Sequence, residues 1–225
     1  MDIVILIIAW AIASFVISVI AGVLGKKYGL GYLIGAMASF AIISSILANK
    51  IIHLGSFVFP AGVVAFSATY LVSDIISERW GRRSAKKAVW VGFFANFVLM
   101  ISIYFALMMP AAPFAVSVSD SFSLALSATP RIIVASFFAY LISQNFNIVS
   151  FFFWMKITNK RHLWLRNSIS TILSQLISSI MFVTIAFYGS FPILNVIIDL
   201  WLIKVFLALL DVPFFYIAIK FIDKL

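Results

Sequence analysis

The sequence contains no cysteine, and charged residues are scarce for its length. The absence of cysteine excludes disulfides, thiolate metal sites and cysteine nucleophiles. Charged residues make up only 10% of the 225 residues and hydrophobic residues 64%. A soluble domain is about 25% charged and about 45–50% apolar, so this much apolar surface cannot be hidden from water. The composition therefore predicts an integral membrane protein.

Acidic residues are the scarcest charged group, with 7 Asp and Glu against 16 Lys and Arg and a net charge of +9. Such a balance in a soluble protein would suggest a nucleic-acid partner. In a membrane protein the basic residues are expected to flank the spans on the cytoplasmic side, so we expect no nucleic acid as partner. No basic residue precedes the apolar run Ile3–Leu24, and this run is longer than a signal peptide requires, which predicts a retained membrane helix.

A helix that crosses a bilayer needs about 20 mostly apolar residues. Seven segments qualify, and six spans are the alternative. The seven are Ile3–Leu24, Leu30–Ala48, Phe57–Ile76, Ala88–Met109, Pro130–Met155, Asn167–Tyr188 and Leu200–Ile222. We expect them to form one all-α polytopic transmembrane bundle, a single domain over residues 1–225. The longest loop, 110–129, has room for a short surface helix.

Basic residues fall on one side of this topology. Thirteen of the sixteen lie in the loops after spans one, three and five or near the C-terminus, whereas the opposite loops contain only Lys50. These thirteen are Lys26, Lys27, Arg79, Arg82, Arg83, Lys86, Lys87, Lys156, Lys160, Arg161, Arg166, Lys220 and Lys224. Positively charged loops stay in the cytoplasm, which predicts an outside N-terminus, a cytoplasmic C-terminus and a multi-pass protein of the cell membrane.

A weak internal repeat joins spans three and four to spans five and six. The segments VAFSATYLVSD at 64–74 and VASFFAYLISQ at 134–144 are identical at five of eleven positions, with an offset of 70. Both segments run from outside to inside, so the pattern predicts a parallel repeat about an axis along the membrane normal. Chance similarity between apolar segments is the alternative.

Several polar residues lie inside the predicted spans, where hydrocarbon requires each polar group to find a partner. Buried charges there usually mark a substrate or ion path. The candidate substrate-binding residues are Asp74, Gln144, Asn147, Gln175, Lys204 and Asp211, and the further candidates are Glu78, Asn96, Arg131 and Tyr140. The alternatives are hydrogen bonds between helices for Asn96, an ion pair with an Asp for Lys204, an interface anchor for Arg131 and packing for Tyr140.

Amides, carboxylates and aromatic rings together suit a flat heterocycle with both hydrogen-bond donors and acceptors, such as a nucleobase. Both histidines, His53 and His162, lie in predicted loops, so we expect no metal and no cofactor. The sequence has no HExxH, GxSxG or Walker motif, and we expect that it is not an enzyme.

Four segments carry a family resemblance. They are DIISERWGRRSAKKAVWVGF at 74–93, ASFFAYLISQNFNIVSFF at 135–152, WLRNSISTILSQLISSIMFVTIAFYG at 164–189 and LIKVFLALLDVPFFY at 202–216. Through them the chain from Phe59 to Lys220 resembles the queuosine precursor transporter family, once described as vitamin-uptake transporters. The resemblance implies uptake of 7-cyano- or 7-aminomethyl-7-deazaguanine for tRNA modification, by secondary or facilitated transport.

The same resemblance implies a match for four of the candidate residues. Asp74 matches the family's acid at the end of span three, and Gln144 matches its span-five glutamine. Gln175 matches the amide position of span six, and Lys204 matches the span-seven lysine. Two departures stand out. Many members have Asp where this chain has Ser178, and others lack an acid at the position of Glu78. The first weakens any mechanism that needs an acid on span six, and the second weakens Glu78 as a ligand.

The residues leave rival functions open. One is a substrate-binding membrane subunit for another vitamin-like heterocycle that works with a separate ATPase module. A second is a membrane scaffold or receptor in which the polar residues only join helices, and a membrane enzyme is the weakest. A proton or another ion could couple to transport. Small residues on spans one and two, including Gly22 and Gly35, suit either a homodimer face or ordinary packing.

Overall fold

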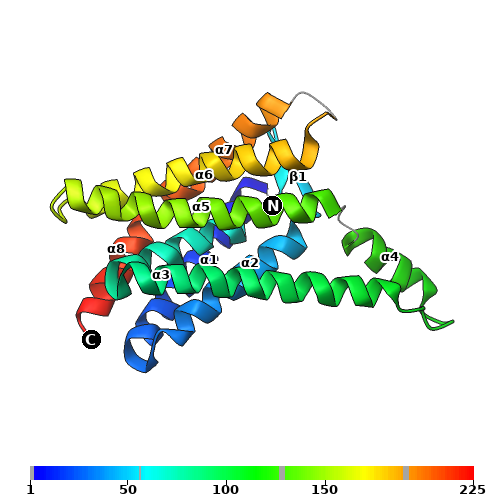
Figure 1. Ribbon diagram of the computed structural model, residues 1–225, viewed down its shortest axis with the longest axis horizontal. Helices are drawn as coiled ribbons and strands as arrows, with labels where there is room; N and C mark the ends of the chain where they lie inside the picture. Colours follow the sequence, from blue (N-terminus) through cyan, green and yellow to red (C-terminus); the bar gives the residue numbers. More distant parts are fainter. Residues whose placement is uncertain (1–2, 56, 127–129, 190–192) are drawn as a thin grey trace.

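The computed structural model describes residues 3–55, 57–126, 130–189 and 193–225, and these residues are almost entirely helical (Figure 1). The helices are α1 (Ile3–Tyr28), α2 (Gly31–Leu47), α3 (Val63–Met108), α4 (Val116–Leu126), α5 (Pro130–Ile157), α6 (Leu163–Phe187), α7 (Ile193–Leu210) and α8 (Val212–Asp223). The two strands β1 (Ile51–Leu54) and β2 (Phe57–Pro60) pair antiparallel, with Ile51 opposite Pro60. The all-α class is confirmed apart from this one small sheet.

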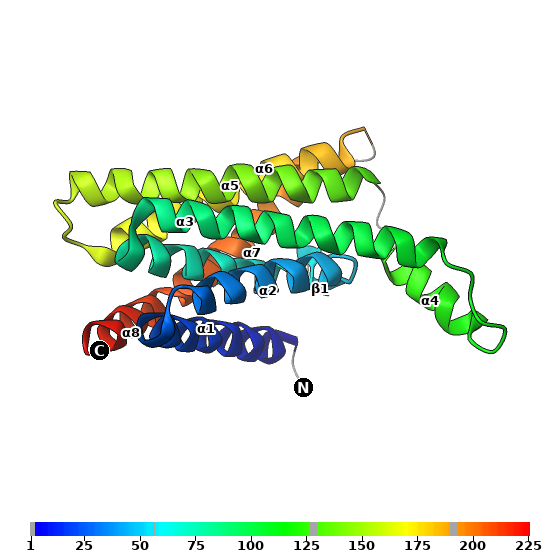
Figure 2. The same ribbon diagram turned by 60° about the horizontal axis from the view of Figure 1, so that its bottom comes forward.

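The long helices form one bundle, in which α3 lies between α5 on one side and α2 and α1 on the other (Figure 2). Figure 1 places α6 and α7 beside α5, and the C-terminus at the end of the bundle opposite to α4. Five stretches of the described residues are long and apolar enough to cross a membrane: α1, α3, residues 134–157 of α5, α6, and residues 193–223. The helix α2 has 17 residues and is slightly shorter.

The helix α3 is a hairpin of two arms, residues 63–80 and residues 82–108, that meet at Gly81. Gly81 has φ +80° and ψ 174°, a backbone conformation that glycine adopts without strain. A straight helix would separate Val63 from Asn96 by about 50 Å. Instead the Gly62 amide donates to the Leu47 carbonyl, and Asn96 lies 2.6 Å from the Ser45 hydroxyl, so both arms reach the same end of α2.

Three predicted spans need correction. The span predicted at Phe57–Ile76 begins at Val63, because Phe57–Pro60 pairs as a strand and Gly55 at φ +60° makes the turn. The span predicted from Ala88 begins directly after Gly81, since the basic residues that follow are good helix formers. The last span is broken at Asp211, as the lack of an N–H on Pro213 favours, and it begins earlier, at Ile193.

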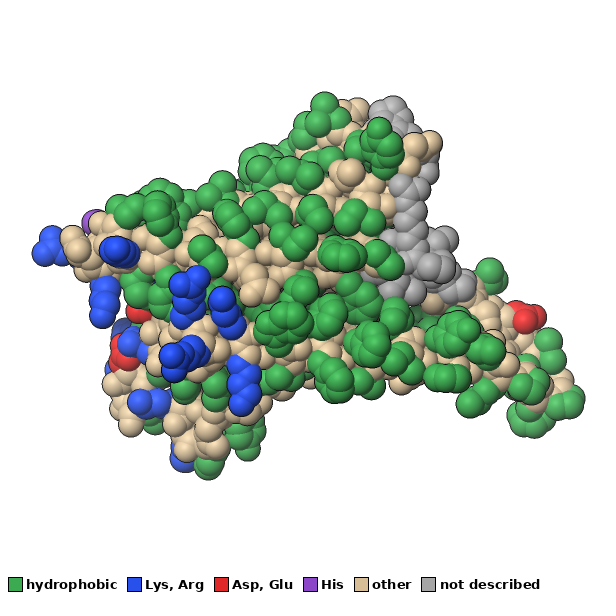
Figure 3. All heavy atoms as spheres, in the orientation of Figure 1, with side chains coloured by type: hydrophobic (Ala, Val, Ile, Leu, Met, Phe, Trp, Pro, Cys, Tyr) green, Lys and Arg blue, Asp and Glu red, His purple; other side chains and the backbone are tan. Residues whose placement is uncertain are grey.

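Basic side chains gather at one end of the molecule, around the turn at Gly81 and the C-terminal ends of α5 and α8 (Figure 3). We call this the basic end. Two ion pairs lie there: Arg166 with Glu78 at 2.6 Å, and Arg79 with Asp223. The predicted surface helix in loop 110–129 is confirmed as α4, none of whose residues is buried. The one-sided clustering of positive charge is what the positive-inside rule requires of a cytoplasmic end.

Candidate functional site

A cavity of about 680 Å³ lies among α2, the second arm of α3, α5, α6 and α7, toward the end opposite the basic end. Its size falls in the range of about 300–1,000 Å³ that is common for small-molecule sites. Most of its walls are apolar. Polar side chains from five helices contribute to its lining, and four of them are Asn96, Tyr140, Ser178 and Lys204. Three of these four were candidates from the sequence.

Lys204 is the one cation that lines this cavity among the described residues, and it is only 3% exposed. Its Nζ donates to the Ser178 hydroxyl at 3.0 Å and lies 5.2 Å from the centre of the Phe66 ring. Within the described residues it has no carboxylate partner, so the predicted rival, an ion pair with an Asp, is not formed. A buried ammonium held only by a hydroxyl and a ring face retains capacity for a hydrogen-bond acceptor.

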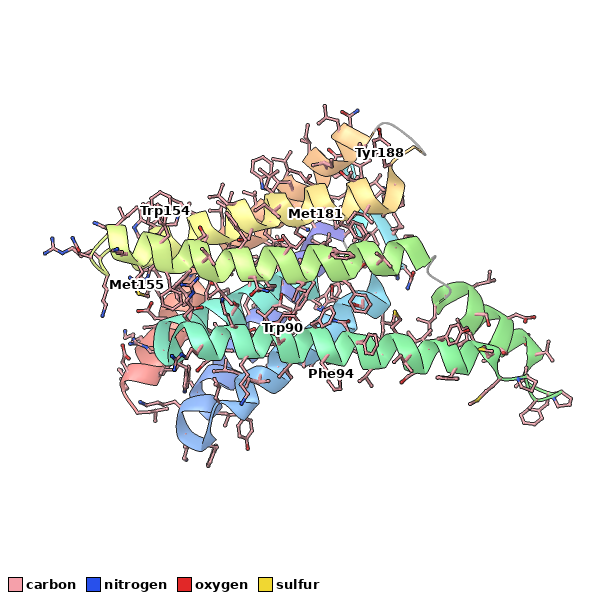
Figure 4. All side chains as sticks on the ribbon, in the orientation of Figure 1. Trp90, Phe94, Trp154, Met155, Met181 and Tyr188 are labelled. Atoms are coloured by element: carbon pink, nitrogen blue, oxygen red, sulfur yellow. The ribbon has the colours of Figure 1, made fainter. Side chains whose placement is uncertain are left out.

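Tyr140 and Phe66 are two of the aromatic residues that line the cavity. Their ring centres are 6.3 Å apart in an edge-to-face arrangement, and the Tyr140 hydroxyl donates to the Val89 carbonyl at 3.3 Å. Trp90 and Phe94, labelled in Figure 4, belong to the second arm of α3 but are 54% and 64% exposed and do not line the cavity. The figure also labels Trp154 near the basic end and Tyr188 near the opposite end.

Below the cavity, α5 packs against the first arm of α3 through hydrogen bonds that the sequence did not specify. The Tyr70 hydroxyl donates to Ser143 at 2.7 Å, and the Gln144 amide donates to Thr69 at 2.7 Å. The partners differ by nearly constant numbers along the chain, so the two helices run parallel. This is the arrangement that the internal repeat requires, although the repeat itself stays a prediction.

Asp74 is fully buried between α5 and α6. Asn147 donates to its Oδ1 at 2.6 Å, and the Thr171 hydroxyl lies 3.3 Å from its Oδ2. Ser174 in turn donates to Asn147 Oδ1 at 3.3 Å. Asp74 and Asn147, both candidates from the sequence, are thus in direct contact, and neither lines the cavity.

The second buried carboxylate, Asp211, lies at the break between α7 and α8. Asn167 donates to Asp211 Oδ1 at 3.0 Å. Because Asn167 and Thr171 are four residues apart on α6, they share one helix face, and the two carboxylates contact that face about one turn apart. Asp74 and Asp211 are close enough to repel each other electrostatically when both are ionised.

Gln175 lies one turn beyond Thr171 on α6 and is fully buried, yet neither its amide oxygen nor its amide nitrogen has a hydrogen-bond partner. Other unpaired buried atoms among the described residues belong to Ser73, Ser77, Glu78, Gln144, Arg166, Asn167 and Ser179. Leaving a buried polar group unpaired costs about 1–3 kcal/mol. Gln175 lies on α6 between Thr171, which contacts Asp74, and Ser178, which lines the cavity, so its unused donor and acceptor are placed to bind a polar ligand.

The remaining candidates lie elsewhere. Glu78 is paired with Arg166 at the basic end, and Arg166 also donates to the Lys160 carbonyl at 2.9 Å. Asn96 lines the cavity, where its amide donates to the Gly92 carbonyl at 3.2 Å. The side chain of Arg131 is outside the part of the chain that the structure describes. Within that part, no group of three or more His, Cys, Asp or Glu residues could hold a metal ion.

Sequence reasoning missed Thr69, Tyr70, Asn167 and Thr171, all of which are buried in this network. Asn167 and Thr171 had a usable signal, because polar residues recur along one face of α6 at Asn167, Ser170, Thr171, Ser174, Gln175 and Ser178. Arg166 was assigned to a cytoplasmic loop but is 3% exposed and lies within α6. The predicted site residues therefore divide between the cavity and the buried network below it.

Helices long enough to cross a membrane, a cavity within the bundle and buried charged side chains are together typical of a multi-pass membrane transporter. Comparison with known families is specific on this point. The chain belongs to the family described as "Putative vitamin uptake transporter", whose pattern matches residues 60–218. It is therefore a transporter and not an enzyme.

One curated relative has a more specific name. The chain is 29% identical over 179 residues to the "Probable queuosine precursor transporter" of Bacillus subtilis, and the match covers 78% of each chain. No solved structure matches the chain significantly.

Proposed function

We propose that this protein imports a 7-deazaguanine precursor of queuosine or archaeosine across the cell membrane by secondary or facilitated transport. The name of the B. subtilis relative supports this substrate class. The single observation that carries the proposal is Gln175, a fully buried amide with no partner, lying between a cavity and two carboxylates. An unpaired amide matches a heterocycle edge that both donates and accepts hydrogen bonds.

The proposed topology has seven crossings. The five long apolar stretches supply six of them when the two arms of α3 are counted separately, and α2 supplies the seventh. With the basic end in the cytoplasm, the N-terminus lies outside and the cavity lies toward the outer half of the bundle. The substrate would then enter the cavity from outside.

In this proposal the substrate first contacts Lys204, Phe66 and Tyr140. The substrate's ring stacks on the two aromatic side chains, and the Lys204 ammonium donates to an acceptor atom of the substrate. It then displaces the hydrogen bonds below the cavity and reaches Gln144 and Gln175, which pair with its carbonyl and its pyrrole N–H. Asp74 accepts from the ring N–H and the exocyclic amine of the guanine-like edge, replacing its contacts with Asn147 and Thr171. The substrate thereby supplies partners to the unpaired atoms of Gln175 and to the unpaired Gln144 amide oxygen, while Asn147 and Thr171 release Asp74.

Binding and uptake test this proposal. Purified protein is titrated with 7-cyano-7-deazaguanine, 7-aminomethyl-7-deazaguanine, guanine and queuine by calorimetry and thermal shift, since a ligand that binds only the folded state raises the melting temperature. We expect saturable micromolar binding of at least one deazaguanine, reduced at least tenfold in Asp74→Asn. Asp120→Asn, the same change at an exposed position on α4, is the matched control and keeps wild-type affinity. A well-folded sample that binds none of the four compounds would refute the proposed substrate class.

The alternative is a substrate-binding subunit for another vitamin-like heterocycle that needs an ATPase module. The family description supports this alternative, because it names vitamin uptake in general and no particular compound. Uptake by the chain alone in proteoliposomes without ATP would exclude it.

A further inference from the structure

The buried charges of the bundle do not balance. Five ionisable acid or base side chains are buried or largely buried among the described residues: Asp74, Glu78, Arg166, Lys204 and Asp211. Arg166 and Glu78 neutralise each other as an ion pair. Lys204 offsets one of the two remaining carboxylates and leaves the other without a counter-charge. An uncompensated carboxylate at the centre of a bilayer costs about 2.5–3.5 kcal/mol on the insertion scale, so a positive species is required.

Contacts distinguish the two carboxylates. Both oxygens of Asp74 accept hydrogen bonds, from Asn147 and from Thr171. Asp211 accepts one from the Asn167 amide nitrogen, while the amide oxygen on the same side chain is buried and has no partner. That oxygen is an acceptor, and it lies beside a carboxyl group that would have a hydrogen to donate only in its protonated form.

We propose that Asp211 is the proton-binding site of this transporter, with Asn167 as the positioning residue that holds the proton in place. In the loaded state the Asp211 carboxylic acid donates to Asn167 Oδ1 and accepts from Asn167 Nδ2, which closes a two-bond ring between the acid and the amide. One proton on Asp211 also makes the buried charge of the described residues sum to zero. The inference rests on the proposed transport function and adds the coupling species to it.

The groups around Asp211 fit a proton better than a metal cation. Every hydrogen-bond partner that the two carboxylates have is a donor: the amides of Asn147 and Asn167 and the hydroxyl of Thr171. A bound sodium ion would have to displace these hydrogens, whereas a proton on Asp211 leaves them and satisfies the one unpaired oxygen. The two buried cations of the described residues have other partners: Arg166 on α6 is paired with Glu78, and Lys204 on α7 donates to Ser178.

The site lies at the junction of two helices. Asp211 separates α7 from α8, and Pro213 lacks the N–H that would continue the helix. When the proton leaves, Asp211 and Asp74 carry like charges about one turn of α6 apart and repel each other. That repulsion weakens the packing of the α7–α8 joint on α6. During import the proton moves from the outer solution to Asp211 and from Asp211 to the cytoplasm, and no covalent bond to the substrate forms or breaks.

Infrared spectroscopy of the substrate-free protein in lipid tests the site directly. We expect a carbonyl band of a protonated carboxylic acid at neutral pH in the wild type. The band should disappear in Asp211→Asn and persist in Asp199→Asn, a matched change on α7 outside the network. In Asn167→Ala the band should shift, because the acid loses its acceptor. A wild type without the band, or a band lost in Asp74→Asn and kept in Asp211→Asn, overturns the proposal.

Uptake gives the second readout. Proteoliposomes with the membrane potential clamped receive a one-unit pH gradient, acid outside. A gradient of one pH unit is a tenfold ratio of proton activity across the membrane. Cotransport of one proton with each substrate molecule therefore supports about tenfold accumulation of the substrate. We expect this accumulation for the wild type and Asp199→Asn, and equilibration without accumulation for Asp211→Asn. Accumulation that follows a sodium gradient at equal pH overturns proton binding. A wild type that takes up no deazaguanine refutes the proposed function instead, and the infrared result then decides the proton site alone.

Discussion

Gly92 lies on the second arm of α3, where it faces the Tyr140 hydroxyl of α5. A Cβ at this position would overlap that hydroxyl and lie 3.2 Å from the ring carbon that carries it. The Gly92→Ala change therefore forces the Tyr140 ring to move and breaks its bond to the Val89 carbonyl. Overpacking costs about 1–3 kcal/mol, and the lost hydrogen bond costs about 1 kcal/mol. The higher helix propensity of Ala returns about 0.5–1 kcal/mol.

The net loss of unfolding free energy for Gly92→Ala is therefore about 2 kcal/mol, or a fall in melting temperature of about 4–8 °C for a chain of this length. In a Tyr140→Phe background the overlapping oxygen is gone, so we expect Gly92→Ala to be neutral there or slightly stabilising. A double-mutant cycle on purified protein in detergent, read by thermal melting, should give a coupling energy of about 2 kcal/mol. Equal destabilisation by Gly92→Ala in both backgrounds would refute the close approach of α3 and α5 at the cavity.

Three further substitutions test the network and the basic end. Gln175→Leu removes an unpaired buried amide, so the substrate-free protein should gain about 1–3 kcal/mol of stability while substrate affinity falls at least tenfold. A less stable variant with unchanged affinity would contradict the assigned role. Lys204→Met keeps the apolar stem and removes the charge, and we expect uptake to fall at least tenfold while size-exclusion profiles stay wild-type. Normal uptake by this variant would show that Lys204 contributes only to packing. Glu78→Gln leaves Arg166 buried without a counter-charge and should lower the melting temperature, by an amount approaching the roughly 3–5 kcal/mol of a broken buried pair. No change in melting temperature would show that the pair is solvated.

The parts of the fold that hydropathy controls could be predicted from the sequence. The apolar runs predicted the bounds of α1, α2, α5 and α6 to within a few residues. The predicted topology also placed most of the basic residues at one end of the bundle, where the structure has them. Asp74 and Asn147 were both predicted as site residues, because a charge or an amide inside a membrane span is costly unless it has a partner or a function. Their direct contact could not be predicted, since it depends on how α5 is rotated against the first arm of α3.

Other features gave the sequence too weak a signal. Thr69 and Thr171 contact Gln144 and Asp74, but a threonine in a membrane helix costs little and usually bonds its own backbone, so its presence indicates nothing by itself. Arg166 looked like one more basic loop residue because its partner, Glu78, is 88 residues away in the chain. The strands β1 and β2 are four residues each, too short for periodicity to separate them from an apolar helix start.

The turn at Gly81 also bears on how the protein enters the membrane. One residue with positive φ joins two long helices, so no flexible loop is available to let one arm wait while the other crosses. We therefore expect the two arms to insert together as a hairpin. In the proposed orientation, the tip is held on the cytoplasmic side by the five basic residues that surround the turn, Arg79, Arg82, Arg83, Lys86 and Lys87. Any side chain at position 81 would strain this turn, and its first effect would be on biogenesis, before any substrate is met.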